Sequence, residues 1–164
     1  MQKKARVAGT AHISILLPDI RSIHNVGSIF RTSDALGVEK IYLSGYTPLP
    51  IDRFGRKRAD LAKVALGAED TVPWEYAEDP QVLIGLLKKD GYQIIALEQA
   101  ENSVDYRNIA VGEKCLIIFG NEVGGVSKSI LEMADATAEI PMKGEKESLN
   151  VSVAAGIFLA SLID

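Results

Sequence analysis

The chain of 164 residues is poor in cysteine and histidine, and this scarcity excludes several kinds of site. Its single cysteine, Cys115, cannot form a disulfide within the chain and fits a reducing compartment such as the cytosol. Because Cys115 lies inside an apolar run, we predict a buried packing thiol rather than a nucleophile. The two histidines, His12 and His24, have no second histidine or cysteine at metal-binding spacing, so no metal site is predicted.

Long apolar runs and a strong positive charge are also missing. No segment is apolar for long enough to cross a membrane, and the basic N-terminus does not resemble a secretory signal, because polar residues interrupt the stretch behind it. We therefore expect a cytoplasmic protein without a membrane partner. The formal net charge of −4 argues against a basic nucleic-acid coat, so any contact with RNA or DNA must come from a local cluster.

The motifs of several enzyme classes are absent as well. The sequence has no G-x-S-x-G elbow, no Walker loop and no paired-carboxylate motif, which leaves a hydrolase or a nucleoside triphosphatase unsupported. The glycine-bearing segment 120–125 does not match a dinucleotide-binding loop, and Glu122 within it would repel a phosphate. Glu139 follows at roughly the spacing of a ribose-binding acid, which we interpret as coincidence. A carboxylate in such a loop suits a cationic neighbour, such as an arginine side chain or a sulfonium.

Strand and helix patterns alternate along the chain, which predicts an α/β fold with a mostly parallel sheet flanked by helices. We expect strands over residues 12–17, 38–43, 92–97, 114–119 and 136–140. We expect helices over residues 26–36, 79–90, 127–133 and 149–163, and an irregular segment over 44–60. The length and the lack of a recognisable linker predict a single domain over residues 1–164, with no added RNA-binding domain.

Three polar segments, far apart in the sequence, accompany these apolar strands. They are residues 25–31, residues 119–125, and residues 140–142 with 148–150. Open α/β sheets bind ligands where their strands end in polar, glycine-bearing loops. We therefore expect the three segments to assemble into one site.

A short basic segment lies between the second predicted strand and the next helix. It contains Arg53, Arg56, Lys57 and Arg58, with Phe54 among them. In an otherwise acidic chain, a dense cationic loop that carries an aromatic residue is suited to contact a phosphate backbone. A solvated surface loop is an equally good interpretation of the same residues.

Together, the polar segments resemble the three motifs of the SpoU class of the SPOUT superfamily, which are RNA ribose 2′-O-methyltransferases. The matching stretches are residues 25–32, residues 119–126, and residues 140–142 with 148–152, in family order and at family-like spacing. The resemblance implies a C-terminal deep trefoil knot, a homodimer with the site near the subunit interface, and S-adenosylmethionine as the cofactor. It also implies an RNA substrate, and the short chain resembles tRNA-modifying members more than those that act on ribosomal RNA.

Residue by residue, the resemblance implies a role for each motif position. The catalytic set is Arg31, which matches the family's catalytic arginine, with Asn25, Glu122 and Asn150. The cofactor pocket is expected to contain Leu97, Gly120, Ile140, Ser148 and Leu149. RNA is expected to contact the catalytic domain itself through Arg53, Arg56, Lys57 and Arg58.

The role of Arg31 stays open between two alternatives. The family mechanism is often drawn with this arginine as the general base, although a guanidinium rarely gives up its proton. The other alternative is that Arg31 orients the ribose and stabilises the developing 2′-oxyanion. In either role we expect Glu122 to hold Arg31 in place, and Ser148 and Asn150 to hydrogen-bond the ribose or the loop backbone.

Two functions of other classes compete with methyl transfer. One is a non-catalytic RNA-binding or ribosome-assembly protein that kept the fold without turnover. Arg31, Glu122 and Asn150 argue against it, because a protein that only binds need not retain them. The other is a dinucleotide-dependent oxidoreductase, which the chemistry of the glycine-bearing loop disfavours.

Overall fold

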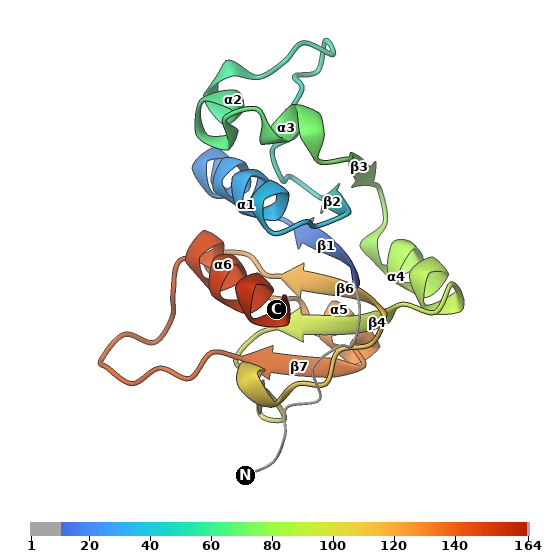
Figure 1. Ribbon diagram of the computed structural model, residues 1–164, viewed down its shortest axis with the longest axis vertical. Coiled ribbons are helices and arrows are strands. Elements are labelled where there is room, and N and C mark those ends of the chain that lie inside the picture. The colour runs from blue at the N-terminus through green and yellow to red at the C-terminus, as the bar shows by residue number, and fades with distance from the viewer. Residues whose placement is uncertain (1–10, 164) are drawn as a thin grey trace.

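The computed structural model, which describes residues 11–163, contains a seven-stranded sheet covered by helices (Figure 1). The strands are β1 (His12–Pro18), β2 (Lys40–Ser44), β3 (Trp74–Ala77), β4 (Gln93–Leu97), β5 (Val104–Asp105), β6 (Lys114–Phe119) and β7 (Ala136–Glu139). Their order across the sheet is β3-β2-β1-β6-β4-β7-β5, and each neighbouring pair is parallel. The predicted α/β class is confirmed.

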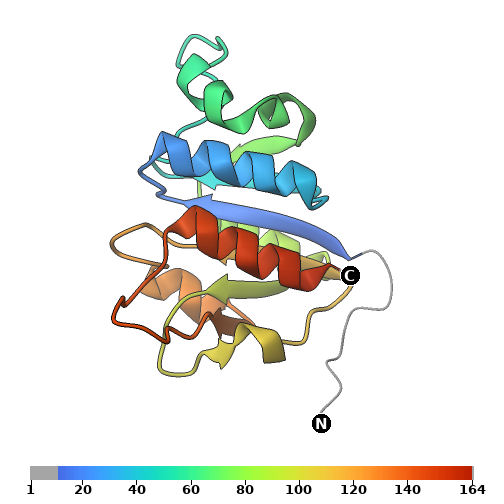
Figure 2. The same ribbon diagram turned by 60° about the vertical axis from the view of Figure 1, so that its left-hand side comes forward.

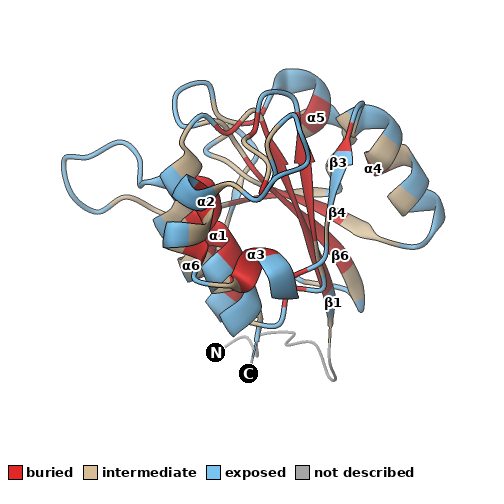
Figure 3. Ribbon diagram, turned by 90° about the horizontal axis from the view of Figure 1, so that it is seen from above, coloured by how far each residue is buried: buried red, intermediate tan, exposed pale blue. Residues whose placement is uncertain are grey.

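The helices divide between the two faces of the sheet. They are α1 (Ile23–Ala35), α2 (Ala59–Ala65), α3 (Ala68–Thr71), α4 (Pro80–Lys89), α5 (Lys128–Met133) and α6 (Val151–Leu162), with a 3₁₀ turn, η1 (Tyr106–Asn108). Helices α1, α2, α3 and α6 pack on one face, and α4 and α5 pack on the other (Figure 3). Helices α1 and α6 run side by side across their face (Figure 2).

The central strands are buried along nearly their whole length, which explains why both faces of the sheet need cover. In β1, Ile15 and Leu17 face the cluster under α1 and α6, whereas Leu16 faces the cluster under α4. In β6, Ile117 and Ile118 divide in the same way. Successive strand residues point to opposite faces, so continuous apolar runs of this kind are typical of parallel strands buried on both sides.

The predicted strands and helices are found with small shifts at their ends. Each predicted strand begins and ends within two residues of the observed one, and residues 114–119 match without a shift. Gly37 and Gly91 follow α1 and α4 with φ of +73° and +86°, as expected of glycines that end helices. Ser127 caps α5 as predicted, because its side-chain oxygen accepts a hydrogen bond from the backbone N–H of Ile130.

Four short elements, α2, α3, β3 and β5, were not predicted. Helix α2 begins at Ala59, so the irregular segment ends at Arg58 rather than at residue 60. Elements of two to seven residues are too short to show a clear period in the sequence. Their stability comes from packing instead: Leu61 and Ala65 of α2 are buried in the cluster beneath α1.

The structure also bears on membrane insertion. Among residues 11–163, no helix is long and apolar enough to cross a bilayer.

Gly27 allows α1 to approach α2 closely, and this gives a test of the packing. A Cβ at Gly27 would lie 2.8 Å from the Cβ of Val64 and 3.1 Å from the carbonyl oxygen of Leu61, so the two helices would have to separate. We expect Gly27→Ala to lower the free energy of unfolding by about 1–3 kcal/mol in urea titrations. The control is Gly85→Ala in α4, where a Cβ meets nothing within 4 Å and should raise stability by up to about 1 kcal/mol. A gain in both variants would show that α1 and α2 can separate without cost.

Candidate functional site

A cavity of about 440 Å³ opens at the edge of the sheet where β4, β6 and β7 end. Its walls come from the segments that follow these three strands and from the segment that leads into α6. Because the strands are parallel, their carboxyl ends share one edge, which is the usual ligand position in open α/β sheets. The second and third of the three polar segments therefore meet around one cavity, whereas no residue of the first segment, 25–31, lines it.

The five residues assigned to a cofactor pocket all line this cavity. They are Leu97, Gly120, Ile140, Ser148 and Leu149. Leu97 ends β4, Gly120 follows β6 and Ile140 follows β7, so parallel pairing brings these three positions together. Ser148 and Leu149 reach the cavity through the long loop that joins β7 to α6 (Figure 1).

The loop after β6 is tight enough to need glycine at two positions. A Cβ at Gly120 would lie 2.4 Å from backbone atoms of Gly125 and Val126. Gly125 has a φ of +66°, and a Cβ there would lie 2.0 Å from Oε2 of Glu98. Asn121 and Gly125 close the loop with two backbone hydrogen bonds of 3.0 Å. The glycines thus set the shape of one cavity wall.

A chain of side-chain hydrogen bonds joins the three polar segments. Nδ2 of Asn150 donates to Oδ1 of Asn25 at 3.0 Å, and Nδ2 of Asn25 donates to Oε1 of Glu122 at 3.0 Å. Asn25 is buried, so both ends of its amide find partners where water is scarce. Asn150 also caps α6, because its Oδ1 accepts from the backbone N–H of Ser152 at 2.9 Å. Three of the four predicted catalytic residues are therefore linked by hydrogen bonds, with Asn25 between Asn150 and Glu122.

The carboxylate of Glu122 lies at the N-terminal end of α1. Its two oxygens accept hydrogen bonds from the backbone N–H groups of Arg21 and Ser22, at 3.0 and 3.1 Å. Burial opposes the charged form, but these amides and the Asn25 side chain outweigh it, so the pKa of Glu122 is lowered. The positive end of the helix dipole favours the anion too. Glu122 thus binds the loop after β6 to the start of α1.

Arg31 lies apart from the other three residues. It stands six residues beyond Asn25 on α1, about 9 Å along the helix axis, and is exposed. It lines a surface groove between α1 and α2 with His24, Lys63 and others, and this groove shares no lining residue with the cavity. The expectation that Glu122 holds Arg31 in place is wrong, because the oxygens of Glu122 bond to Arg21, Ser22 and Asn25.

Comparison with known proteins agrees with this arrangement. The family model described as the SpoU rRNA Methylase family matches residues 12–160. The chain belongs to this family. It is 36% identical over 145 residues to a Staphylococcus saprophyticus protein whose name places it in the TrmH family, and 34% identical over 145 residues to the tRNA (guanosine(18)-2'-O)-methyltransferase of Aquifex aeolicus. Each match covers 88% of this chain, but only 55% and 65% of the two relatives.

Solved structures of family members have the same fold. The AdoMet-bound rRNA methyltransferase of Sinorhizobium meliloti superposes with a TM-score of 0.84 at 30% identity, covering 94% of this chain and 56% of that one. The TrmH/SpoU tRNA modifying enzyme of A. aeolicus gives a TM-score of 0.81 at 30% identity, covering 97% of this chain and 76% of that one. The chain thus spans about half to three quarters of the length of these SpoU relatives.

Sequence reasoning missed several residues that line the cavity of this SpoU protein. Glu98 follows β4, and its Oε2 accepts from the backbone N–H of Val126 at 2.7 Å, which ties β4 to the loop after β6. Gln99 donates from Nε2 to the carbonyl of Glu147 at 2.8 Å, which ties it to the loop before α6. Glu139, whose spacing we interpreted as coincidence, also lines the cavity. The available signal was position, since Glu98 and Gln99 directly follow Leu97 at a strand end.

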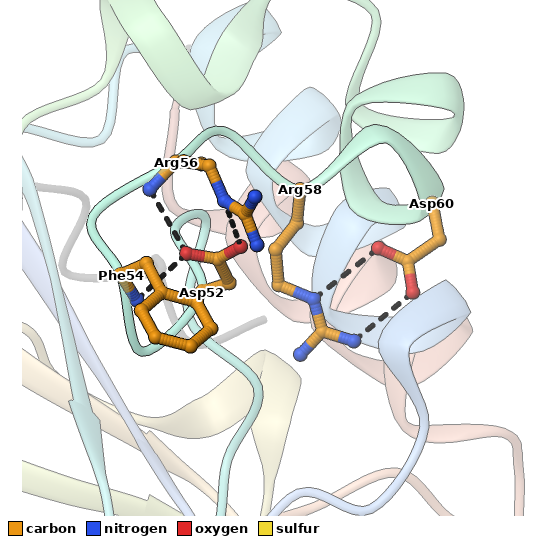
Figure 4. A network of polar contacts seen from close by, with 5 residues as sticks. All are labelled: Asp52, Phe54, Arg56, Arg58 and Asp60. Carbon is orange, nitrogen blue, oxygen red and sulfur yellow. Dashed lines mark hydrogen bonds and ion pairs between the residues drawn. The ribbon is translucent and has the colours of Figure 1, made fainter.

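The basic segment is present on the surface, but most of its charge is paired locally (Figure 4). Arg56 pairs with Asp52 at 2.9 Å, and Arg58 pairs with Asp60 at 3.0 Å. Lys57 lies between two acidic groups of α3, 3.0 Å from Glu69 and 2.7 Å from Asp70. Hydrogen bonds from Arg58 lower the pKa of Asp60, and those with Asp70 and Glu69 raise the pKa of Lys57, so the charged forms of Asp60 and Lys57 are favoured.

Cys115 and the acidic and histidine side chains offer no second centre in the described part of the chain. Cys115 is buried in β6, as predicted, and burial raises the pKa of its thiol to about 12. A thiol in this state is a poor nucleophile near neutral pH. Among residues 11–163, no group of three or more histidine, cysteine, aspartate or glutamate side chains is placed to hold a metal ion.

The lowered pKa of Glu122 gives a test of the hydrogen-bond chain. Because the folded-state pKa lies below the ordinary value of 4.5, the ionised carboxylate stabilises the fold above that value, and this contribution is lost as the pH falls through the folded pKa. We expect ¹³C NMR titration of Glu122 to give a midpoint below 4.5, and Asn25→Ala to shift it upward, because one hydrogen bond is lost. Asn108→Ala, an exposed amide of η1, should leave the midpoint unchanged. If the titration midpoint of Glu122 were the same in the wild type and in Asn25→Ala, the proposed chain of hydrogen bonds would be contradicted.

Proposed function

We propose that this chain transfers a methyl group from S-adenosylmethionine to a ribose 2′-hydroxyl of RNA, with tRNA as the favoured substrate. The observation that carries the proposal is that the second and third motif segments meet around one cavity with an acidic and apolar wall, while Asn25 of the first segment is hydrogen-bonded to both of them. Membership of the SpoU family supports the same activity, and so do the names of its relatives, which include tRNA (guanosine(18)-2'-O)-methyltransferases of A. aeolicus and Borreliella burgdorferi.

The cavity fits the chemical character of S-adenosylmethionine. Its volume of about 440 Å³ is within the usual range for small-molecule sites. Leu97, Ile140 and Leu149 offer apolar surface to an adenine ring. Glu98 and Glu122 also line the cavity, and none of the described lining residues is a lysine or arginine. An acidic wall favours a ligand that carries a sulfonium and an ammonium group.

The residues of the chain would then position the reactants rather than create a strong nucleophile. When bound, S-adenosylmethionine supplies a methyl group already activated by its sulfonium. The protein has to hold the ribose oxygen in line with that methyl group and exclude water. Glu122 and Asn150 hold the loop after β6 and the start of α6 in register, and the exposed hydroxyl of Ser148 is free to approach the ribose.

Arg31 is proposed to act on the RNA side of the reaction. The groove that it lines also contains Lys63, so two cationic side chains face a phosphate next to the target ribose. A guanidinium bound to phosphate can orient the ribose and stabilise the developing 2′-oxyanion. This role needs no loss of the guanidinium proton.

A methyl-transfer assay tests the proposed activity. Incubation with S-adenosylmethionine labelled in the methyl group and with unfractionated tRNA should place label on ribose 2′-oxygens, detected as nuclease-resistant 2′-O-methyl dinucleotides. Arg31→Ala should lower the rate at least about 100-fold, as expected when an oxyanion-stabilising donor is removed. Arg107→Ala, an exposed arginine paired with Asp105 outside the site, should keep the rate.

The remaining outcomes separate the competing functions. If label appeared in ribosomal RNA but not in tRNA, ribosomal RNA rather than tRNA would be the substrate class. RNA binding without label, in a protein that shows no donor binding by calorimetry, would favour the non-catalytic RNA-binding protein.

We also propose a homodimer in which the cavity of one protomer is completed by Arg31 of the other. Within one chain, Arg31 and the cavity are separate, and α6 exposes Val153 and Ile157 beside the residues that face the cavity. An exposed apolar helix face of this kind is suited to contact a second copy. Family resemblance supports the dimer and a deep trefoil knot in the C-terminal part, and the RNA substrate and the buried lone cysteine fit a cytoplasmic location.

Subunit mixing tests the shared site. Arg31→Ala removes the guanidinium, and Ser148→Arg places a cation in the cavity, where it should abolish donor binding in calorimetry. Each variant alone should be inactive. Mixed dimers, formed by co-expression with two different tags, should regain methyl transfer, because one intact cavity then meets one intact Arg31. Inactive mixed dimers would place both groups of a site in the same chain.

A further inference from the structure

The loop between β2 and α2 presents an exposed aromatic ring at its tip. Phe54 is 66% exposed, and the guanidinium carbons of Arg53 and Arg56 lie 4.8 and 5.0 Å from the centre of its ring. These distances are within the range of cation–π contacts. A single exposed apolar side chain is ordinary on a protein surface, but an exposed aromatic ring with guanidiniums close to it is also the kind of surface on which nucleobases stack.

Hydrogen bonds fix this loop before any partner binds (Figure 4). Oδ1 of Asp52 accepts from the backbone N–H of Phe54 at 2.8 Å and from that of Arg56 at 3.0 Å. The backbone N–H of Asp52 donates to the carbonyl of Arg56 at 2.8 Å, and Gly55 makes the turn with a φ of +77°. At the base, the N–H of Arg58 donates to the carbonyl of Pro50 at 2.9 Å. The ring is therefore presented in one place, and binding need not order the loop.

The local ion pairs weaken the alternative of a phosphate clamp. Arg56, Lys57 and Arg58 each have a carboxylate partner within the chain. A phosphate would have to compete with these carboxylates for the same donors. The ring of Phe54 is 66% exposed, and its cation–π contacts with Arg53 and Arg56 are weaker than a charged hydrogen bond, so base stacking is the contact that the loop is best built to make.

The loop is also connected to the cavity wall. It starts at the carboxyl end of β2, and the parallel sheet places that end at the same edge as the cavity. The hydroxyl of Tyr46, at the start of the loop, accepts from Nδ2 of Asn121 at 2.9 Å, and Asn121 lines the cavity. The backbone N–H of Tyr46 donates to Asp19 at 3.1 Å, and Asn121 donates to the carbonyl of Asp19 at 2.6 Å. Hydrogen bonds thus join the start of this loop to a residue of the cavity wall.

We propose that Phe54 is a stacking platform for an unpaired base of the substrate RNA. The proposal rests on the proposed function and narrows its substrate to RNA with a single-stranded segment near the target ribose. The bases in a duplex are stacked on their own neighbours and hide their faces, whereas an unpaired base can lie flat on the ring, with the Arg53 and Arg56 guanidiniums beside it.

Binding of short RNAs, measured by fluorescence anisotropy, tests this platform. The probes are labelled single-stranded oligoadenosine, an oligomer of equal length and charge without bases, and a base-paired duplex. The wild-type protein should bind oligoadenosine roughly 5- to 100-fold more tightly than the abasic oligomer. Phe54→Ala should lose this preference and Phe54→Trp should keep it. Since a ring releases no counterions, Phe54→Ala should leave the salt dependence of binding unchanged.

Leu86→Ala removes a similarly exposed apolar side chain from α4 and is the matched control, expected to bind all three probes as the wild type does. The proposal is overturned if the wild type binds oligoadenosine no better than the abasic oligomer, if Phe54→Ala keeps the preference, or if sedimentation shows that Phe54→Ala changes the oligomeric state. Donor binding by calorimetry and methyl transfer are measured on the same variants. A protein that prefers oligoadenosine through Phe54 but transfers no methyl group would contradict the proposed function alone.

Discussion

The hydrogen-bond chain from Asn150 through Asn25 to Glu122 is the interaction on which the rest of the site depends. It joins Asn25 to two residues that lie 97 and 125 positions further along the chain, and each link lies at or near the start of a helix. The buried amide of Asn25 donates on one side and accepts on the other, so a substitution at any of the three leaves a polar group without its partner. These hydrogen bonds fix the start of α1, the start of α6 and the loop after β6 relative to one another. The start of α6 and the loop after β6 form walls of the cavity.

The surface divides its charges between two regions. The cavity at the ends of β4, β6 and β7 contains carboxylates and apolar side chains, whereas the groove between α1 and α2 contains Arg31, Lys63 and His24. An acidic cavity suits a cationic methyl donor, and a basic groove suits an anionic RNA backbone. Keeping the groups apart in one chain prevents Arg31 from pairing with the cavity carboxylates, so that its charge is available to a substrate.

Sequence patterns were sufficient for the central elements and for part of the cavity lining, and the physical reason differs between the two. Strands such as residues 114–119 are continuous apolar runs, because both faces of a parallel sheet are buried. Leu97, Gly120 and Ile140 could be grouped because they follow such strands, whose carboxyl ends share one edge. The short elements α2 and α3 gave no comparable signal, since they are held by packing against α1 rather than by their own periodicity.

By itself, then, the sequence determined the order of most strands and helices and the three motif segments with their polar side chains, whereas Glu98 and Gln99 were recognised as cavity residues only in the structure. Only the tertiary structure decided which of these side chains touch. In the folded protein, Glu122 accepts hydrogen bonds from the backbone N–H groups of Arg21 and Ser22 rather than from Arg31. The cationic residues Arg56, Lys57 and Arg58 form ion pairs with nearby carboxylates. The contacts of Glu122 depend on how closely the loop after β6 approaches the start of α1, and the pairing of Lys57 depends on the packing of its loop against α3. Arg56 and Arg58, by contrast, pair with carboxylates four and two residues away in the chain, in a geometry that the folded loop sets.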